Sequence, residues 1–114
     1  MDRNCKTVNP YTKKEITGLI RKSQENGSMD SLERRAKALS DTNRIKIYYA
    51  LGVAELCVCE ISELLGIPQP TVSGCLKELY NAGLLIRRKE GKWAYYSVVA
   101  QDPIKFEVPF HEIQ

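Results

Sequence analysis

The sequence predicts a mainly α-helical fold with one small β-hairpin, and three observations between Glu55 and Ser97 carry this prediction. A short amphipathic segment with apolar residues at Ile61, Leu64 and Leu65 ends in a Gly-Ile-Pro turn. A second amphipathic segment follows. After it, the apolar residues no longer recur with the helical period but alternate with a period of about two residues, which is typical of strands. This order of helix, turn, helix and two-stranded ribbon is that of a winged helix-turn-helix.

The limits of the second helix are predicted from residues that favour helix ends. Pro70 suits the first turn of a helix, where the missing N–H costs nothing, and Gly83 suits its end. Val72, Leu76 and Leu79 recur at i, i+4 and i+7, which predicts one buried stripe. The opposite face carries small or polar side chains that allow close approach to a DNA groove, or form an ordinary solvated surface: Thr71, Ser73, Gly74 and Lys77.

The hairpin that follows is basic. Leu84 to Lys89 and Lys92 to Val98 are two β-prone runs joined at Glu90-Gly91. Four cations surround its tip: Arg87, Arg88, Lys89 and Lys92. From Pro68 to Ser97 there are five Lys or Arg and two Glu, a surplus that equals the formal net charge of +3 of the whole chain. Since each phosphate neutralised by such groups releases counterions, this local charge favours DNA binding over a merely solubilising surface.

The composition indicates a single domain without a membrane span. The chain has 114 residues, of which 43% are hydrophobic and 27% charged, and no apolar run approaches the roughly 20 residues of a spanning helix. The first residues lack the apolar centre of a signal peptide, so we expect a cytoplasmic protein. In that compartment four cysteines favour metal binding or redox chemistry over structural disulfides.

The N-terminal part predicts a polar arm followed by scaffold helices. Thr12 and Glu15 form a capping box at the start of a helix whose apolar residues are Ile16, Leu19 and Ile20. A short helix with so narrow an apolar stripe is not stable alone. It must therefore pack on the rest of the chain or on a partner chain. We expect residues 1–27 to form the arm and dimerisation helix, 28–99 the DNA-binding domain and 100–114 an extended tail, all within one compact domain.

Two cysteines lie just before the helix-turn-helix. If residues 56–59 are extended, Cys57 and Cys59 point to one side, and Cys59 enters the first turn of the next helix. Unpaired N–H groups at a helix N-terminus favour thiolate, which is the form that binds metals. Soft metals prefer three or four sulfur ligands, so a third thiol must come from Cys5 or Cys75. The alternative is a pair of small, half-buried apolar residues without further function.

Glu55 to Ser97 resembles the ArsR/SmtB family of metal-responsive bacterial and archaeal repressors. Residues 38–47 resemble the family's preceding helix, and the Lys-Glu-Gly-Lys turn with Tyr95-Tyr96 resembles its wing. The run Glu-Leu-Cys-Val-Cys-Glu from Glu55 is similar to the thiolate motif of the arsenite- and cadmium-sensing branches. The resemblance implies a homodimer that represses an inverted-repeat operator and leaves it when As(III), Cd(II) or Pb(II) binds.

By the same resemblance, Cys57 and Cys59 are metal ligands, Gln69 to Lys77 is the reading face and Arg87 to Lys92 is the wing. The arsenite branch often carries another cysteine where this chain has Ser62, whereas the cadmium and lead branch recruits one from its N-terminal arm. We therefore predict the metal site Cys5, Cys57 and Cys59, with Cys5 supplied by the same chain or by its partner.

Two further departures concern the reading helix and the tail. The family usually carries larger polar or basic residues at positions 74 and 75, so direct contact with bases or phosphates is weakened and rests on Thr71, Ser73 and Lys77. Pro103 and Pro109 interrupt the tail, which is expected to be extended rather than a dimerisation helix.

Three functions remain open on this scaffold. The first is a repressor released by a soft metal or metalloid effector, without a permanent cofactor. The second is a thiol redox switch in which Cys5 or Cys75 resolves against Cys57 or Cys59. The third is a thiol enzyme, which we reject because neither a positioned base nor a Cys-X-X-Cys pair is visible, so no catalytic residue is predicted.

Overall fold

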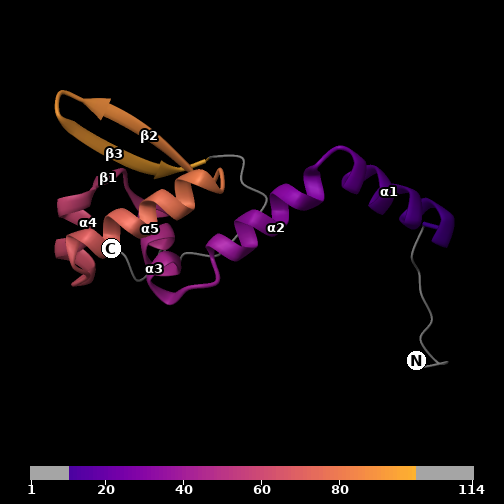
Figure 1. Cartoon of the computed structure of the whole chain (residues 1–114), viewed down its shortest axis with the longest axis horizontal. Helices are drawn as coiled ribbons and strands as arrows, with labels where there is room; N and C mark the ends of the chain where they lie inside the picture. Colours follow the sequence, from indigo (N-terminus) through magenta and orange to yellow (C-terminus); the bar gives the residue numbers. More distant parts are fainter. Residues whose placement is uncertain (1–10, 100–114) are drawn as a thin grey trace. The chain divides into compact units, whose positions relative to one another are not determined.

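The computed structural model describes residues 11–99, so the predictions for Cys5 and for the tail 100–114 lie outside the described residues. The elements follow in the order α1 (Lys13–Glu25), α2 (Ser28–Ala38), α3 (Thr42–Val53), β1 (Leu56–Cys57), α4 (Val58–Leu65), α5 (Gln69–Asn81), β2 (Leu85–Glu90) and β3 (Trp93–Val98) (Figure 1). The chain divides into two compact units, Met1–Leu32 and Glu33–Gln114, which are described separately.

Helix α1 dominates the first unit. Its predicted capping box is confirmed: the Thr12 N–H donates to Glu15 Oε2 at 3.0 Å, and the Glu15 N–H donates to Thr12 Oγ1 at 3.2 Å. No residue of α1 is buried, and Ile16, Leu19 and Ile20 are all exposed. Within the described residues this apolar stripe therefore lacks a covering element.

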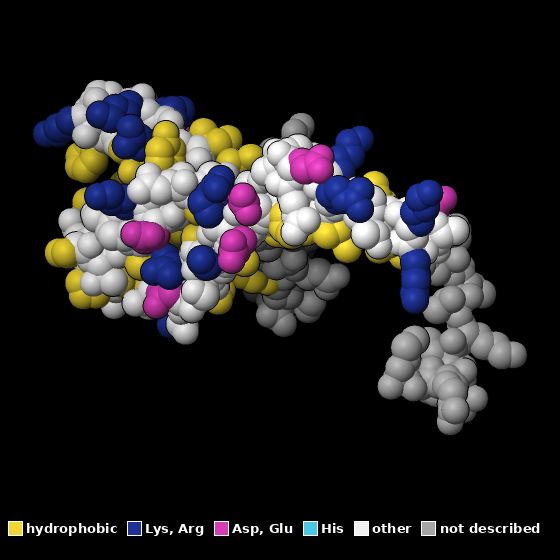
Figure 2. All heavy atoms as spheres, turned by 45° about the vertical axis from the view of Figure 1, so that its right-hand side comes forward, with side chains coloured by type: hydrophobic (Ala, Val, Ile, Leu, Met, Phe, Trp, Pro, Cys, Tyr) yellow, Lys and Arg dark blue, Asp and Glu magenta, His cyan; other side chains and the backbone are white. Residues whose placement is uncertain are grey.

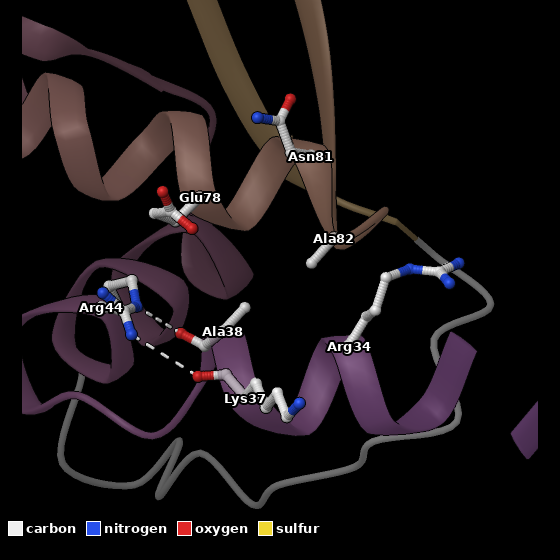
Figure 3. A pocket seen from close by; sticks show the side chains of 7 residues that line it. All are labelled: Arg34, Lys37, Ala38, Arg44, Glu78, Asn81 and Ala82. Carbon is white, nitrogen blue, oxygen red and sulfur yellow. Dashed lines mark hydrogen bonds between the residues drawn. The ribbon is translucent and has the colours of Figure 1, made fainter. Parts of the chain in front are cut away.

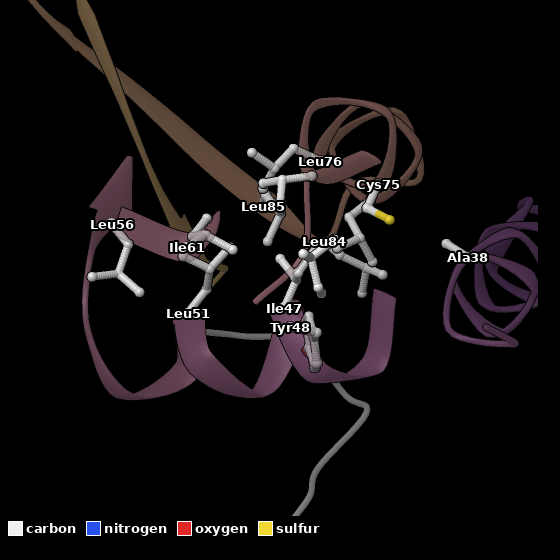
Figure 4. Close-up of a cluster of buried hydrophobic side chains, with 13 residues drawn as sticks. Ala38, Ile47, Tyr48, Leu51, Leu56, Ile61, Cys75, Leu76, Leu84 and Leu85 are labelled. Atoms are coloured by element: carbon white, nitrogen blue, oxygen red, sulfur yellow. The ribbon is translucent and has the colours of Figure 1, made fainter. Parts of the chain in front are cut away.

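The second unit has a hydrophobic core between α3, α4, α5 and the base of the hairpin (Figure 4). Six large side chains in it are almost completely inaccessible: Ile47, Ile61, Val72, Leu76, Leu79 and Leu84. The stripe predicted on the second helix is among them, so the prediction that one face of that helix is buried is confirmed. This packing fixes the opposite face of α5 towards solvent.

A tight turn joins α4 to α5. Gly66 takes a left-handed conformation with φ +66°, and the Ser62 hydroxyl donates to the Ile67 carbonyl oxygen at 2.6 Å. Helix α5 begins at Gln69, one residue earlier than expected from Pro70, because Pro68 takes the cap position and Pro70 still falls where no N–H is needed. The Ser62 side chain thus stabilises the turn.

The hairpin belongs to a three-stranded antiparallel sheet in the order β1-β3-β2. Strand β3 pairs with β2 from Leu85 opposite Val98 to Glu90 opposite Trp93, and Gly91 turns between them with φ +62°. Strand β1 pairs with the other edge of β3. The extended segment expected at residues 56–59 ends at Cys57, because α4 already begins at Val58.

Residues 11–99 contain no helix that is both long and apolar enough to cross a bilayer.

Candidate functional site

The outer face of α5 is accessible along its length. Five predicted DNA-contacting residues are exposed on this helix: Gln69, Thr71, Ser73, Gly74 and Lys77. Their neighbours Val72, Leu76 and Leu79 are buried in the core, so the helix cannot rotate without exposing them. The structure therefore leaves all five predicted residues exposed on the part of α5 that is not packed against the core.

The four cations of the hairpin are exposed on β2 and at the turn. Figure 2 shows Lys and Arg side chains gathered around the hairpin tip at its upper left. The Arg87 guanidinium lies 5.2 Å from the centre of the Tyr80 ring on α5, and the Lys92 ammonium lies 5.9 Å from the Trp93 ring. Because Arg87 contacts Tyr80, the face of the hairpin that carries Arg87 is directed towards α5, the helix that carries the predicted reading face.

Arg88 differs from the other cations because two carboxylates bind it. Its Nη2 lies 2.9 Å from Glu55 Oε1, and its Nη1 lies 2.9 Å from Glu90 Oε2. Hydrogen bonds from Arg88 hold the pKa of Glu55 below its usual value, and the bonds to Glu55 and Glu90 raise the pKa of Arg88. Sequence reasoning missed Glu55 as a partner, because no local pattern reports a contact between residues 33 positions apart.

Residues 55–59 form what we call the thiol segment. Cys57 precedes α4 as its N-cap and is only 8% exposed, while Cys59 lies in the first turn and is exposed. The Cys57 N–H donates to Glu60 Oε1 at 3.0 Å, which fixes the start of the helix. The expectation that Cys59 enters the first turn is confirmed.

The thiol segment contacts the reading helix directly. Gln69 Nε2 donates to Cys59 Sγ at 3.6 Å, a distance suited to a sulfur acceptor. Gln69 is the first residue of α5. A predicted metal ligand and a predicted DNA-contacting residue thus share one hydrogen bond.

Cys75 lies apart from this segment. It is 7% exposed within the core of the second unit, and Figure 4 shows its sulfur on the side of α5 that faces Ala38. Burial raises the pKa of the Cys75 thiol, and the nearby Asp41 carboxylate raises it further. Position 75 therefore belongs to the core rather than to the reading face.

The donor set for a metal ion is incomplete within the described range. Among residues 11–99, no three Cys, His, Asp or Glu side chains gather closely enough to hold an ion. Cys57 and Cys59 supply two sulfur donors of the kind that soft metals prefer. A soft-metal site built on these two cysteines would need a third donor from residues outside this range, such as Cys5, or from a second chain.

A hollow of about 320 Å³ lies between the end of α2, the start of α3 and the end of α5 (Figure 3). Its charged lining consists of Arg34, Lys37, Arg44 and Glu78. Arg44 Nε donates to the Ala38 carbonyl oxygen at 2.6 Å and thereby satisfies the C-terminus of α2. We assign Arg44 this structural role.

Comparison with known proteins agrees with this geometry. Residues 41–87 match the family described as bacterial regulatory protein, arsR family. A cadmium resistance transcriptional regulatory protein CadC homolog of Staphylococcus aureus is 46% identical over 63 residues, which are 54% of this chain and 52% of that protein. A putative arsenical resistance operon repressor of Halobacterium salinarum is 48% identical over 61 residues, 52% of this chain and 47% of the relative. The chain thus spans about half the length of these curated relatives.

A solved structure extends the likeness. The homodimeric winged helix-turn-helix DNA-binding domain of a possible ArsR-family regulator from Mycobacterium bovis superposes with a TM-score of 0.60. It is 31% identical, and the match covers 65% of this chain and 68% of that one. The predicted fold is confirmed, and a family of regulatory proteins agrees with the prediction that the chain is not an enzyme. The chain belongs to the ArsR family of bacterial regulatory proteins.

Proposed function

We propose that two copies of the chain bind operator DNA and repress transcription, and that a soft metal or metalloid at cysteine thiolates releases them. The exposed polar face of α5 and the cations of the hairpin support the DNA-binding part, because grooves and phosphates require such groups. The relatives named for cadmium and arsenical resistance support the class of effector.

The single observation that carries the release step is the hydrogen bond from Gln69 to Cys59. A bound As(III), Cd(II) or Pb(II) ion would serve as a template that gathers thiolate sulfurs. The Cys59 sulfur would then turn towards Cys57 and a third sulfur, and Gln69 would lose its acceptor. Since Gln69 is the first residue of α5, loss of this hydrogen bond would alter the contacts of the reading helix at its N-terminus.

The proposal includes a homodimer. Two reading helices must match half-sites about one turn of DNA apart, so a change in their spacing weakens both contacts together. The exposed stripe of Ile16, Leu19 and Ile20 on α1 offers an apolar surface for a second copy. The homodimeric Mycobacterium bovis domain supports the same assembly.

The test is a titration of a preformed complex. Reduced protein is bound to a duplex selected from a random-sequence pool, and Cd(II), Pb(II) or arsenite is added while fluorescence anisotropy reports binding. We expect at least one of the three to lower the affinity at least tenfold in the wild type and not in Cys59→Ser. If none releases the duplex, while peroxide releases it and dithiothreitol restores it, the redox alternative replaces the metal proposal.

A further inference from the structure

Strand β1 belongs to the thiol segment and to the wing at the same time. Cys57 pairs with Tyr95 on β3, and Leu56 pairs with Tyr96. A predicted metal ligand is therefore itself an edge residue of the sheet that carries the hairpin. A displacement of β1 would therefore act on β3 through the sheet, as well as on α4 through the chain.

Arg88 connects β2 with β3 and with the residue that precedes β1. It starts on β2, its guanidinium lies 4.9 Å from the centre of the Tyr95 ring on β3, and it reaches Glu55, which directly precedes β1. The contact with Glu55 is bidentate, with Nε to Oε2 at 3.1 Å and Nη2 to Oε1 at 2.9 Å. Such a planar fork fixes the orientation of both side chains.

The alternation of β2 puts Arg88 on the opposite face from its neighbours. Arg87 contacts Tyr80 of α5, so its face looks towards the reading helix, and Lys89 shares that face by the period of two. Within residues 11–99, neither Arg87 nor Lys89 has an ion pair, whereas Arg88 has two. Although the Arg88 side chain is exposed, its charge is thus already balanced by two carboxylates of the protein itself.

We propose that Arg88 is a positioning residue that ties the wing to the thiol segment through Glu55, and does not contact DNA phosphate. The regulatory half of this inference rests on the function proposed above. In that function, gathering sulfurs around Cys57 displaces β1 and Glu55, and Arg88 transmits the displacement to the hairpin. The wing then responds together with α5, which Cys59 contacts through Gln69.

The first test uses the salt dependence of DNA affinity. A phosphate contact contributes about 0.9 to the slope of log K against log salt concentration, so Lys89→Gln should reduce the magnitude of the slope by about one. Arg88→Gln should lower the affinity by about two- to fivefold, the range of a surface ion pair, with the slope of the wild type. A slope reduced as in Lys89→Gln would overturn the assignment.

Glu55→Gln and Glu90→Gln form a matched pair that controls for charge. Each removes one negative charge and one partner of Arg88, but only Glu55 lies beyond β3 and connects the hairpin to β1. We expect Glu55→Gln to lower DNA affinity as Arg88→Gln does, with no additive loss in the double variant, and Glu90→Gln to bind at least as well as the wild type. If Glu55→Gln instead tightens binding by freeing Arg88, the inference is wrong.

The second test measures transmission. The ratio of DNA dissociation constants with and without whichever of Cd(II), Pb(II) or arsenite releases the wild type is expected to fall at least threefold in Glu55→Gln and to keep the wild-type value in Glu90→Gln. Equal ratios in the two variants would refute transmission through Glu55. A wild type that ignores Cd(II), Pb(II) and arsenite refutes the proposed release, whereas the salt slopes still decide the role of Arg88.

Discussion

Gly74 offers a direct test of the reading helix. It lies in the middle of α5 on the exposed face, its φ is not positive, and a Cβ added there would meet no atom within 4 Å. Replacement by alanine therefore removes only the backbone entropy cost of glycine. We expect Gly74→Ala to stabilise the fold by about 0.5–1 kcal/mol. For a unit of this size that corresponds to a rise in Tm of about 2–8 °C.

The assay is urea unfolding followed by far-UV circular dichroism at one fixed protomer concentration, since dimerisation would couple stability to concentration. Gly83→Ala is the matched control, because Gly83 also has open space around it but takes φ +83°. A left-handed alanine costs about 1–2 kcal/mol, so this variant should be destabilised. If Gly74→Ala is destabilised as much as Gly83→Ala, our placement of Gly74 in a regular, unobstructed helix is wrong.

Three further predictions concern the core and the thiols. Ile61 is completely inaccessible, so Ile61→Ala should lower the free energy of unfolding by about 2–5 kcal/mol in the same urea assay, and a loss under 1 kcal/mol would contradict the packing. Iodoacetamide should modify exposed Cys59 well before buried Cys57 and Cys75 in native protein, as mass spectrometry of peptides can show, and equal rates would contradict the burial. Because the folded state raises the pKa of Cys75, the unfolded chain releases that proton first as pH rises, so the wild type should lose stability above about pH 8.5. Cys75→Ala should lose less over the same pH range, and parallel stability curves for the two proteins would refute this.

Local sequence patterns were sufficient for the buried face of the reading helix and for the start of α1. The stripe of Val72, Leu76 and Leu79 predicted which face of α5 is buried, and the Thr12 capping box marked the start of α1. Both depend on contacts within a few residues, which periodicity and capping rules describe. Helix α5 begins one residue before the predicted start at Pro70. Both Pro68 and Pro70 suit the beginning of a helix, and the structure places Pro68 at the cap.

The contacts that join distant segments could not be predicted in this way. Nothing near Glu55 in the sequence indicates that Arg88 binds it, and the third strand β1 is only two residues long. The sequence alone places Cys75 within the predicted reading face, whereas the packing of α5 buries its side chain in the core. Such features depend on which helix faces meet in space, and one sequence does not encode that in a local pattern.

The hydrogen bond between Gln69 and Cys59 has a thermodynamic consequence for a cell. Linkage is reciprocal, so the factor by which an effector weakens the hold on DNA is also the factor by which DNA weakens the hold on the effector. On the function proposed here, a regulator bound to its operator therefore has a lower affinity for the effector than the same molecule free in solution. Small amounts of effector would therefore bind first to regulator molecules that are not on DNA. The controlled genes would be transcribed only after most of these free molecules have bound effector.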